Sequence, residues 1–310
     1  MTEFPVLVSA RHEVAEGVFA LELMAVDGGE LPGWTPGAHI DVAVGAAGVR
    51  QYSLCGDPGE PDRWRVAVLH EPAGRGGSDH LRRTAIPGAQ LQVSVPRNNF
   101  ELVARDRYVF VAGGIGITPI LPMLAAAEAS GAHWSLHYGG RTKAHMAFAD
   151  ELAQRHPNVV LLPQDQHGLL PLAEIMAEQG DAAVYCCGPE PLLAAVEAEG
   201  ARRGLSVHVE RFVPRPVAAA VDAPFEVRLA SSGRTFRIGA KQTIADVLEG
   251  ASVSIITSCR EGTCGSCETA VLAGDIDHRD SILTAAERAR GNTMMLCVSR
   301  AGSDVLVLDL

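Results

Sequence analysis

The sequence predicts a multidomain protein: an antiparallel β-barrel, then an α/β domain with a parallel sheet, then a small α+β module. Three observations support this prediction. The 310 residues exceed what one ordinary hydrophobic core accommodates. Near Tyr108 the short apolar runs separated by turn residues are replaced by apolar runs that end in glycine and alternate with helical stretches. Three of the seven cysteines fall within residues 259–267, after a stretch rich in Pro and Ala.

The composition indicates a folded protein with no nucleic-acid partner. Hydrophobic residues make up 47% of the chain and charged residues 20%, which is typical of globular proteins. A net charge of −11 at pH 7 argues against nucleic acid, whose phosphates call for Lys/Arg patches.

One uncharged segment, residues 108–127, is about long enough to span a membrane. It contains glycines and prolines at positions that would break a spanning helix, so a buried strand, a glycine turn and a helix start explain it better. The start of the chain, "MTEFPVLVSARHEV", has no basic flank followed by an apolar run. We therefore expect no membrane association and a cytoplasmic protein.

Residues 1–103 contain short runs such as "HIDVAVG" and "WRVAVLH", separated by turn residues, which predict the barrel. In "RQYSLCG" the alternation of a strand places Arg50, Tyr52 and Leu54 on one face, and Gln51, Ser53 and Cys55 on the other. Such an arginine can bind a phosphate and such a tyrosine can stack on a ring. A salt bridge and a core aromatic are the alternatives.

In "GRGGSDHLRRT", Gly76, Gly77 and Ser78 run directly into a predicted helix, with Ser78 or Asp79 as its N-cap. Free backbone N–H groups and a hydroxyl at this point make an anion site that suits a phosphate, although a plain helix start has the same pattern.

Residues 104–213 alternate apolar runs that end in glycine with helical stretches, the pattern of a parallel sheet that binds ligands at the carboxyl ends of its strands. In "VFVAGGIGITPIL", Gly114 and Gly116 either let the backbone approach a ligand or form a tight turn. The spacing is not that of the G-x-G-x-x-G fingerprint.

In "YCCGPEPLL", Cys187 and Gly188 come at the carboxyl end of a predicted strand, and Cys186 points to the opposite face. Cys187 is either a functional thiol or a small buried hydrophobe. Arg141 and Lys143 in "YGGRTK" follow another strand, where they could meet a 2′-phosphate, a pyrophosphate or solvent.

Residues 214–224 form a Pro/Ala-rich stretch without amphipathic period, which predicts an interdomain linker. In residues 225–310, "FEVRLASSGRTFRI" predicts a hairpin turning at Ser232-Gly233, and "TIADVLEGA" a short helix capped by Thr243.

The cysteines of this module follow the spacing C-x4-C-x2-C, and a fourth comes after 29 intervening residues, which is the plant-type [2Fe–2S] arrangement. Gly262 and Gly265 let backbone N–H groups approach the cluster. A zinc ribbon would need a second C-x2-C knuckle, and a Rieske centre two histidines in place of two cysteines. The predicted ligands are Cys259, Cys264, Cys267 and Cys297.

The chain resembles the phthalate dioxygenase reductase family. The resemblance is carried by five motifs in this order: R-x-Y-S, G-R-G-G-S, G-G-I-G-I-T-P, C-G-P and the cysteine-bearing cluster loop, residues 258–268. The resemblance covers essentially the whole chain, and residues from Phe225 onward are similar to plant-type ferredoxins. It implies an FMN-binding β-barrel domain (1–103), an NAD(P)-binding parallel-sheet domain (104–213), a linker (214–224) and a β-grasp ferredoxin domain (225–310).

The resemblance also implies the roles of individual residues. FMN is expected to contact Arg50, Tyr52 and Ser53, with Ser53 near the flavin N5, and its phosphate to contact Gly76, Gly77 and Ser78. Ser53, Thr118 and Cys187 are expected to be catalytic, with Thr118 at the flavin–nicotinamide contact and Cys187 near the nicotinamide ring. Other expected cofactor contacts are Gly114 and Gly116 beside the dinucleotide, Gly188, Arg141, and Phe212 of "VERF" near the isoalloxazine. The R-G-G-S loop favours FMN over FAD.

The implied function is the reductase component of an oxygenase system. Electrons would pass from NADH, or NADPH as the alternative, through FMN and the [2Fe–2S] cluster to a Rieske non-haem iron oxygenase or a cytochrome P450. Flavin is the necessary converter, since hydride brings two electrons and the cluster accepts one. The alternatives are a redox-sensing regulator and a reductase that acts on a small acceptor.

Overall fold

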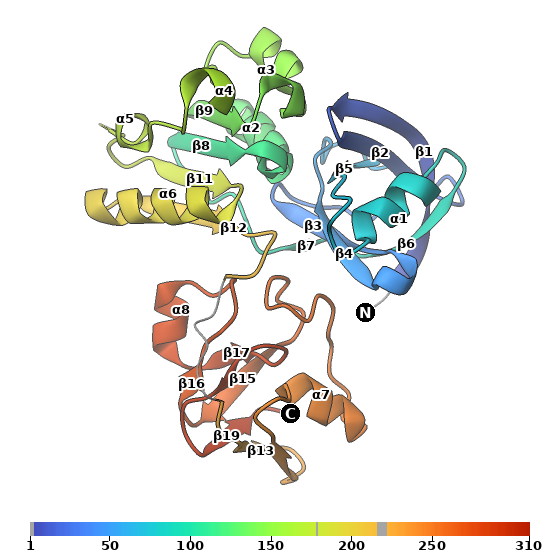
Figure 1. Ribbon diagram of the computed structural model, residues 1–310, viewed down its shortest axis with the longest axis vertical. Coiled ribbons are helices and arrows are strands. Elements are labelled where there is room, and N and C mark those ends of the chain that lie inside the picture. Colours follow the sequence, from blue (N-terminus) through green and yellow to red (C-terminus); the bar gives the residue numbers. More distant parts are fainter. Residues whose placement is uncertain (1–2, 178, 216–221) are drawn as a thin grey trace. The chain divides into compact units, whose positions relative to one another are not determined.

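The computed structural model describes residues 3–177, 179–215 and 222–310, which form two compact units (Figure 1). One unit comprises residues 2–210 and the other residues 211–310. The predicted linker, residues 214–224, lies partly outside the described residues. Within the part of the chain that is described, no helix combines the length and the apolarity needed to cross a bilayer.

The first unit begins with a seven-stranded antiparallel sheet in the order β4-β3-β6-β1-β2-β5, with β7 paired to β3. A bridge between Leu54 and Val66 joins the end of β4 to β5, so the sheet closes on itself, as the antiparallel barrel prediction requires. Fully buried Phe19, Ile40 and Trp64 contribute to its core. The elements are β1 (Glu3–Ala15), β2 (Val18–Ala25), β3 (Ala38–Ala43), η1 (Gly45–Ala47), β4 (Val49–Ser53), β5 (Trp64–Leu69), α1 (Gly77–Thr84), β6 (Gln90–Ser94) and β7 (Arg97–Asn98).

The second sheet of this unit is wholly parallel, in the order β10-β9-β8-β11-β12, as predicted. Its helices lie on both faces: α2 and α3 pack on one face, and α5 and α6 on the other (Figure 1). The elements are β8 (Arg107–Gly113), η2 (Gly114–Gly116), α2 (Ile117–Ala129), β9 (His133–Gly140), η3 (Lys143–His145), α3 (Ala149–Arg155), β10 (Val159–Pro163), α4 (Gln164–His167), α5 (Leu172–Ile175), β11 (Ala183–Cys187), α6 (Glu190–Arg203) and β12 (Ser206–Glu210).

The chain leaves β8 for β9 on one side and later returns to place β11 on the other side. Ligands of open α/β sheets bind at such a switch point, outside the carboxyl ends of the strands. Here these ends carry the glycine turn after β8 and the Cys187-Gly188 pair after β11.

The barrel and the parallel sheet share one hydrophobic core. Buried barrel residues such as Val18, Cys55 and Ala67 belong to the same cluster as Ile117 and Met123 of α2. The connection between the two sheets is also fixed, because the hydroxyl of Tyr185 accepts the N–H of Val103 and donates to the carbonyl of Glu101. The two sheets therefore form one folding unit.

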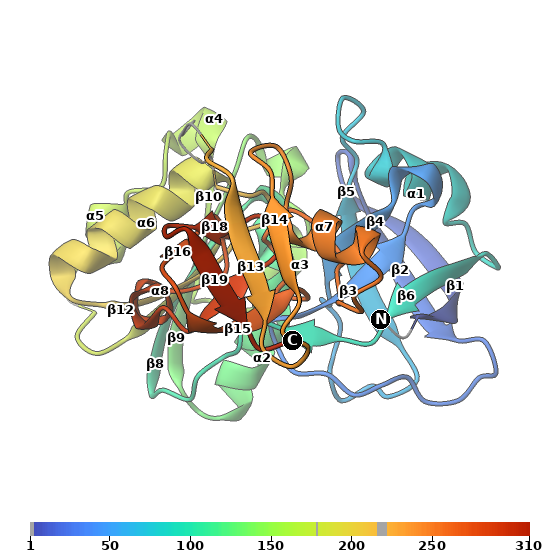
Figure 2. The same ribbon diagram turned by 90° about the horizontal axis from the view of Figure 1, so that it is seen from below.

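The C-terminal unit holds a mixed sheet in the order β14-β13-β19-β15-β17, whose first four strands lie side by side in Figure 2. Ile244 and Leu248 of α7 belong to its core. The predicted hairpin and the predicted helix with its Thr243 cap are both confirmed, and Asp246 completes the capping box. The elements are β13 (Phe225–Leu229), β14 (Thr235–Ile238), α7 (Ile244–Gly250), β15 (Glu268–Ala273), β16 (Ile276–Asp277), α8 (Ala285–Arg290), β17 (Thr293–Met295), β18 (Arg300–Ala301) and β19 (Val305–Leu308).

Candidate functional site

Arg50 lies against the start of α1, which brings two of the predicted phosphate-binding motifs together. Its guanidinium Nη1 donates to the carbonyls of Ala47 and Val49, both at 2.8 Å, and Nη2 donates to that of Arg75 at 3.2 Å. A Cβ on Gly77 would lie 2.6 Å from Arg50 Cγ, so glycine is what allows this approach. The guanidinium is thus fixed beside the first turn of the helix.

The predicted N-cap of α1 is wrong. The helix starts at Gly77, its N-cap is Gly76 with φ +81°, and no side chain caps it. Ser78 Oγ instead accepts the N–H of Glu71 at 3.0 Å, and Asp79 pairs with Arg83. A left-handed glycine at the cap leaves the first-turn amides without intrahelical partners, so they remain available to an anion.

Beyond β4, the predicted alternation is confirmed: Leu54 lies in the barrel core, while Cys55 lies in the core shared with the parallel sheet. Burial raises the pKa of Tyr52 to about 12. Ser53 is buried, and its hydroxyl makes no hydrogen bond of ordinary length within the described residues. Its polar neighbour is the Glu210 carboxyl, so the hydroxyl keeps hydrogen-bonding capacity that a ligand can satisfy.

Glu210, the last residue of β12, is the functional candidate that the sequence reasoning missed. Burial raises the pKa of its carboxyl to about 8, and the nearby Ser53 hydroxyl opposes this shift. Cys187 pairs with Glu210 in the sheet register, and its Sγ lies 4.0 Å from Glu210 Oε2. Ser53, Cys187 and Glu210 therefore converge from three strands.

Cys186 and Cys187 point to opposite faces of the sheet, as predicted. Cys187 is fully buried, and burial and then the Glu210 charge raise its pKa well above the ordinary value. The protein therefore keeps this thiol protonated. The sequence signal that points to Glu210 is its place at the carboxyl end of a strand, within the "VERF" motif.

The glycine turn after β8 contains one position, Gly116, that packing between strands requires to be glycine. A Cβ on Gly116 would lie 2.2 Å from the carbonyl oxygen of Cys187. Glycine at this position therefore lets the carboxyl ends of β8 and β11 approach each other. Gly114, with φ +56°, meets nothing within 4 Å and faces open space. Thr118 is buried, and its hydroxyl donates to the Ile115 carbonyl at 2.9 Å.

The other predicted nucleotide contacts lie at the edge of this region or in the other unit. Arg141 is exposed directly after β9, and Lys143 pairs with Asp150 at 2.8 Å on the surface. Gly188 follows β11 and packs against Gly113. Phe212 is 40% exposed and belongs to the unit of residues 211–310, so its proximity to a flavin stays a prediction.

The four predicted ligand cysteines converge in the C-terminal unit. Cys259 forms thiol contacts with Cys264 and Cys297, which lower its pKa, and Cys267 also contacts Cys297. Backbone N–H groups of Glu261 and Ser266 point at two of the sulfurs, at 3.3 and 3.4 Å. This donor set, four thiols with N–H donors around them, fits a diiron cluster.

Among the described residues, no group of three or more His, Cys, Asp or Glu side chains is arranged to hold a single metal ion. A diiron cluster divides its four thiolates between two irons, so its ligands need not meet at one point.

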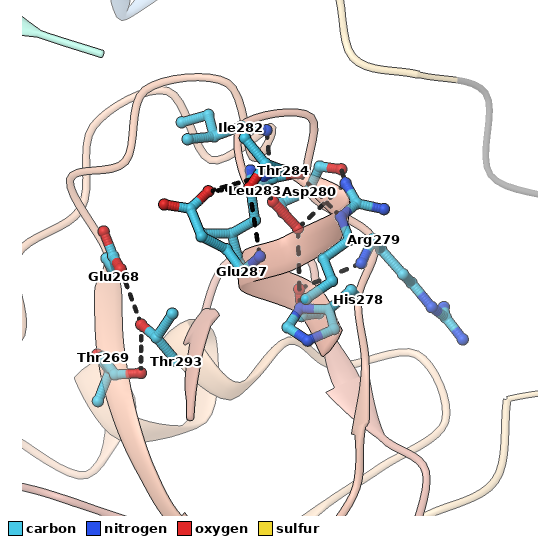
Figure 3. A network of polar contacts seen from close by, with 12 residues as sticks. Glu268, Thr269, His278, Arg279, Asp280, Ile282, Leu283, Thr284, Glu287 and Thr293 are labelled. Carbon is cyan, nitrogen blue, oxygen red and sulfur yellow. Dashed lines mark hydrogen bonds and ion pairs between the residues drawn. The ribbon is translucent and has the colours of Figure 1, made fainter. Parts of the chain in front are cut away.

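Residues 278–287 form a network of polar contacts (Figure 3), and a backbone hydrogen bond joins them to the cluster loop, residues 258–268. Ser281 donates its N–H to the Gly262 carbonyl at 2.8 Å, which ties this segment to the loop. The buried Asp280 carboxylate accepts the N–H of Leu283 at 2.9 Å, and a capping box of Thr284 and Glu287 starts α8. On the other side of the loop, Arg260 pairs with Asp246 and Glu249 of α7.

Comparisons with known proteins agree with this arrangement. Residues 227–302 match the family described as a 2Fe-2S iron-sulfur cluster binding domain, and residues 110–198 match the oxidoreductase NAD-binding domain. The phenoxybenzoate dioxygenase subunit beta of Ectopseudomonas oleovorans is 44% identical over 310 residues, which cover 96% of each chain. The phthalate dioxygenase reductase of Burkholderia cepacia is 38% identical, over 98% of this chain and 96% of that protein.

Two solved structures extend these similarities. A crystal structure of phthalate dioxygenase reductase, described as a modular structure for electron transfer from pyridine nucleotides to [2Fe-2S], matches with a TM-score of 0.72, 36% identity and coverage of 99% and 98%. An intact type IV self-sufficient cytochrome P450 monooxygenase matches with a TM-score of 0.92 and 42% identity. The match covers 99% of this chain but 41% of that longer chain.

Proposed function

Because the chain belongs to the phthalate dioxygenase reductase family, we propose that it is the reductase component of an oxygenase system. It would take electrons from NADH and deliver them to a partner oxygenase, which is either a Rieske non-haem iron enzyme or a cytochrome P450. Several similar proteins are named as subunits of such systems, and the P450 match carries a similar chain within one polypeptide. The proposed location is the cytoplasm.

The observation that carries the proposal is the convergence of Ser53, Cys187 and Glu210 within one packed unit. Ser53 ends the strand proposed to hold flavin, and Cys187 ends the strand at the switch point where a dinucleotide would bind. The two binding regions therefore meet at this trio. A flavin and a nicotinamide ring bound to them would be adjacent.

We assign the residues to cofactors as follows. FMN would be held through its phosphate by Arg50 and the first turn of α1, including Gly76, Gly77 and Ser78, and through its ring by Tyr52 and Ser53. The nicotinamide nucleotide would lie against Gly114, Gly116, Thr118, Arg141, Cys187 and Gly188. The [2Fe–2S] cluster would bind to Cys259, Cys264, Cys267 and Cys297. Phe212 is proposed to pack near the isoalloxazine.

When bound, FMN and the cluster supply the conversion of a two-electron hydride into single electrons. The protein supplies placement and electrostatics. Glu210 stays protonated at neutral pH because its pKa is raised to about 8, so no negative charge is buried beside the Ser53 hydroxyl. Ser53 would then be free to donate a hydrogen bond to the bound flavin ring, and Arg50 would bind the flavin phosphate.

We also propose the domain bounds 1–103, 104–213 and 225–310, joined by a linker at 214–224. The change from antiparallel to parallel pairing falls between β7 and β8, and the C-terminal sheet begins with β13 at Phe225, which support these bounds.

The decisive experiment is an anaerobic titration of the purified full chain with NADH, followed by optical and EPR spectroscopy, with the flavin identified by mass. We expect flavin and cluster to be reduced together, with NADPH less effective. A protein without flavin or iron after careful reconstitution would refute the proposal. Bound cofactors that NADH does not reduce would favour the redox-sensing regulator instead.

Turnover with purified oxygenases tests the partner. We expect a Rieske oxygenase or a P450 to hydroxylate its substrate with this chain as the sole electron donor. If only ferricyanide or another small acceptor were reduced, the small-acceptor reductase would be the better assignment.

A further inference from the structure

The segment that follows β9, residues 141–148 and here called the nucleotide loop, ends in an unusual backbone conformation. Phe148 has φ +61° and ψ 8°, in the left-handed region. A bulky side chain is strained in this region, whereas glycine or asparagine adopts it readily. A phenylalanine held there must be fixed by its surroundings.

One contact of the ring is with Arg65 on β5 of the barrel. The guanidinium Cζ of Arg65 lies 5.2 Å from the centroid of the Phe148 ring, within the range of a cation–π interaction. The ring is also packed against the core that the barrel shares with the parallel sheet. Phe148 therefore joins the nucleotide loop to the barrel.

Arg65 is in turn hydrogen-bonded at the end of β4, the strand proposed to hold flavin and here called the flavin strand. Its Nε and Nη2 donate to the carbonyl of Cys55 at 3.2 and 2.8 Å, and Cys55 N–H donates to the Arg65 carbonyl at 2.8 Å. Cys55 is fully buried and stands two residues after Ser53. One planar guanidinium thus contacts both the flavin strand and the nucleotide loop.

Two further contacts fix the same loop. The Tyr138 hydroxyl lies 3.2 Å from the carbonyl oxygen of Ala147 and 3.1 Å from that of Gly114, so it connects the loop with the glycine turn. The N–H of Glu16, in the turn between β1 and β2, donates to the Ala144 carbonyl at 2.7 Å. The loop is therefore held from the barrel and from the parallel sheet.

We propose that Arg65 and Phe148 form a clasp that sets the position of the nucleotide loop relative to the flavin strand, so that both are positioning residues for hydride transfer from a nicotinamide nucleotide to the flavin. Neither residue touches the reacting atoms in this assignment. The proposal deepens the proposed function and rests on it. Its physical basis is that hydride transfer requires the two rings at a fixed separation, and a displacement of about 1 Å can slow a reaction by about 100-fold.

The test uses the full-length protein with its cofactors and four variants. Arg65→Gln removes the charge and the two-pronged donor. Phe148→Leu keeps an apolar side chain and the backbone strain but has no ring face, and Phe148→Tyr keeps the ring. Arg11→Gln is the matched control, since Arg11 lies 4.1 Å over the Phe19 ring and donates to the Arg82 carbonyl, in the barrel alone.

The first measurement is amide hydrogen exchange of residues 141–148, which does not depend on activity. We expect exchange to be faster in Arg65→Gln and Phe148→Leu and unchanged in Phe148→Tyr and Arg11→Gln. The second is the limiting rate of flavin reduction by NADH in anaerobic stopped flow. It should fall about 10-fold in the first two variants, within the range for misplacement, at unchanged flavin content and cluster EPR signal.

Unchanged exchange in both Arg65→Gln and Phe148→Leu would overturn the clasp. A rate loss in Phe148→Tyr or Arg11→Gln as large as in Arg65→Gln would also overturn it, because the effect would then not be specific to this contact. If NADH failed to reduce the flavin of the wild-type protein, the proposed function would fall, and the exchange measurement would still decide whether the clasp exists.

Discussion

At the scale of single residues, burial decides the charge of the candidate site. Burial raises the pKa of both Glu210 and Cys187, and the Glu210 charge raises the pKa of Cys187 further. Ser53 adds a hydroxyl to this pair. The trio therefore holds protons at neutral pH, which suits a site where a neutral ring must approach.

The raised pKa of Glu210 predicts a pH-dependent stability. A folded-state pKa of about 8 against an ordinary value of 4.5 means that the folded state binds the extra proton between these two values. Stability is therefore lost as pH rises through this window, by up to about 1.4 kcal/mol per pH unit. Glu210→Gln should remove this loss, measured as the urea midpoint of flavin release between pH 6 and pH 9. Exposed Glu60→Gln is the control, and parallel curves for wild type and Glu210→Gln would contradict the prediction.

Ser53→Ala tests the role of the buried Ser53 hydroxyl directly. Loss of one donor aimed at a reacting group costs about 10²-fold in rate, so flavin reduction by NADH should slow by about this factor. Flavin content should hardly change, because Arg50 and α1 are proposed to carry the phosphate. Ser9→Ala, which removes an exposed hydroxyl bonded to the Glu22 carbonyl, is the control. An unchanged rate would remove Ser53 from the proposed catalytic residues.

At the scale of elements, the close packing of the carboxyl ends of β8 and β11 determines the backbone geometry of the nucleotide region. The turn after β8 packs directly on the backbone after β11, and Gly116 occupies the point of closest approach. The glycine pattern is therefore as much a requirement of strand–strand packing as of ligand binding.

Gly116→Ala tests this interpretation. Because the new Cβ would lie 2.2 Å from a backbone carbonyl, two main-chain segments must move apart. We expect a loss of about 1–3 kcal/mol, the usual cost of overpacking, in urea unfolding of the full-length protein. Gly33→Ala is the matched control, since a Cβ there meets nothing within 4 Å. Equal stability of the two variants would show that the turn has room to adjust.

At the scale of the whole molecule, the chain separates into a unit that holds the flavin and nucleotide regions and a unit that holds the four predicted ligand cysteines. Each has its own hydrophobic core. The division predicts that damage to the iron–sulfur unit leaves the chemistry of the other unit intact.

Cys297→Ser tests this independence. A diiron cluster that loses one of four thiolates should no longer assemble or give its EPR signal. Flavin reduction by NADH should keep its wild-type rate, while transfer to a partner oxygenase should stop. Arg260→Gln serves as a control in the cluster loop that keeps all four ligands. If flavin reduction were lost along with the cluster, the two units would not be independent.

The sequence by itself determined the features that depend on neighbouring residues. The cysteine spacing, the hairpin at Ser232-Gly233, the Thr243 cap and the opposite faces of Cys186 and Cys187 all follow from turn chemistry and strand period. Even among these local features, the predicted N-cap of α1, Ser78 or Asp79, was wrong, because the N-cap is Gly76 in the left-handed conformation and no side chain caps the helix. Only the tertiary structure decided that Glu210 meets Ser53 and that Arg65 meets Phe148, since these contacts join different elements far apart in the chain. No local period encodes how a barrel and a parallel sheet pack together, and that packing is what assembles the site.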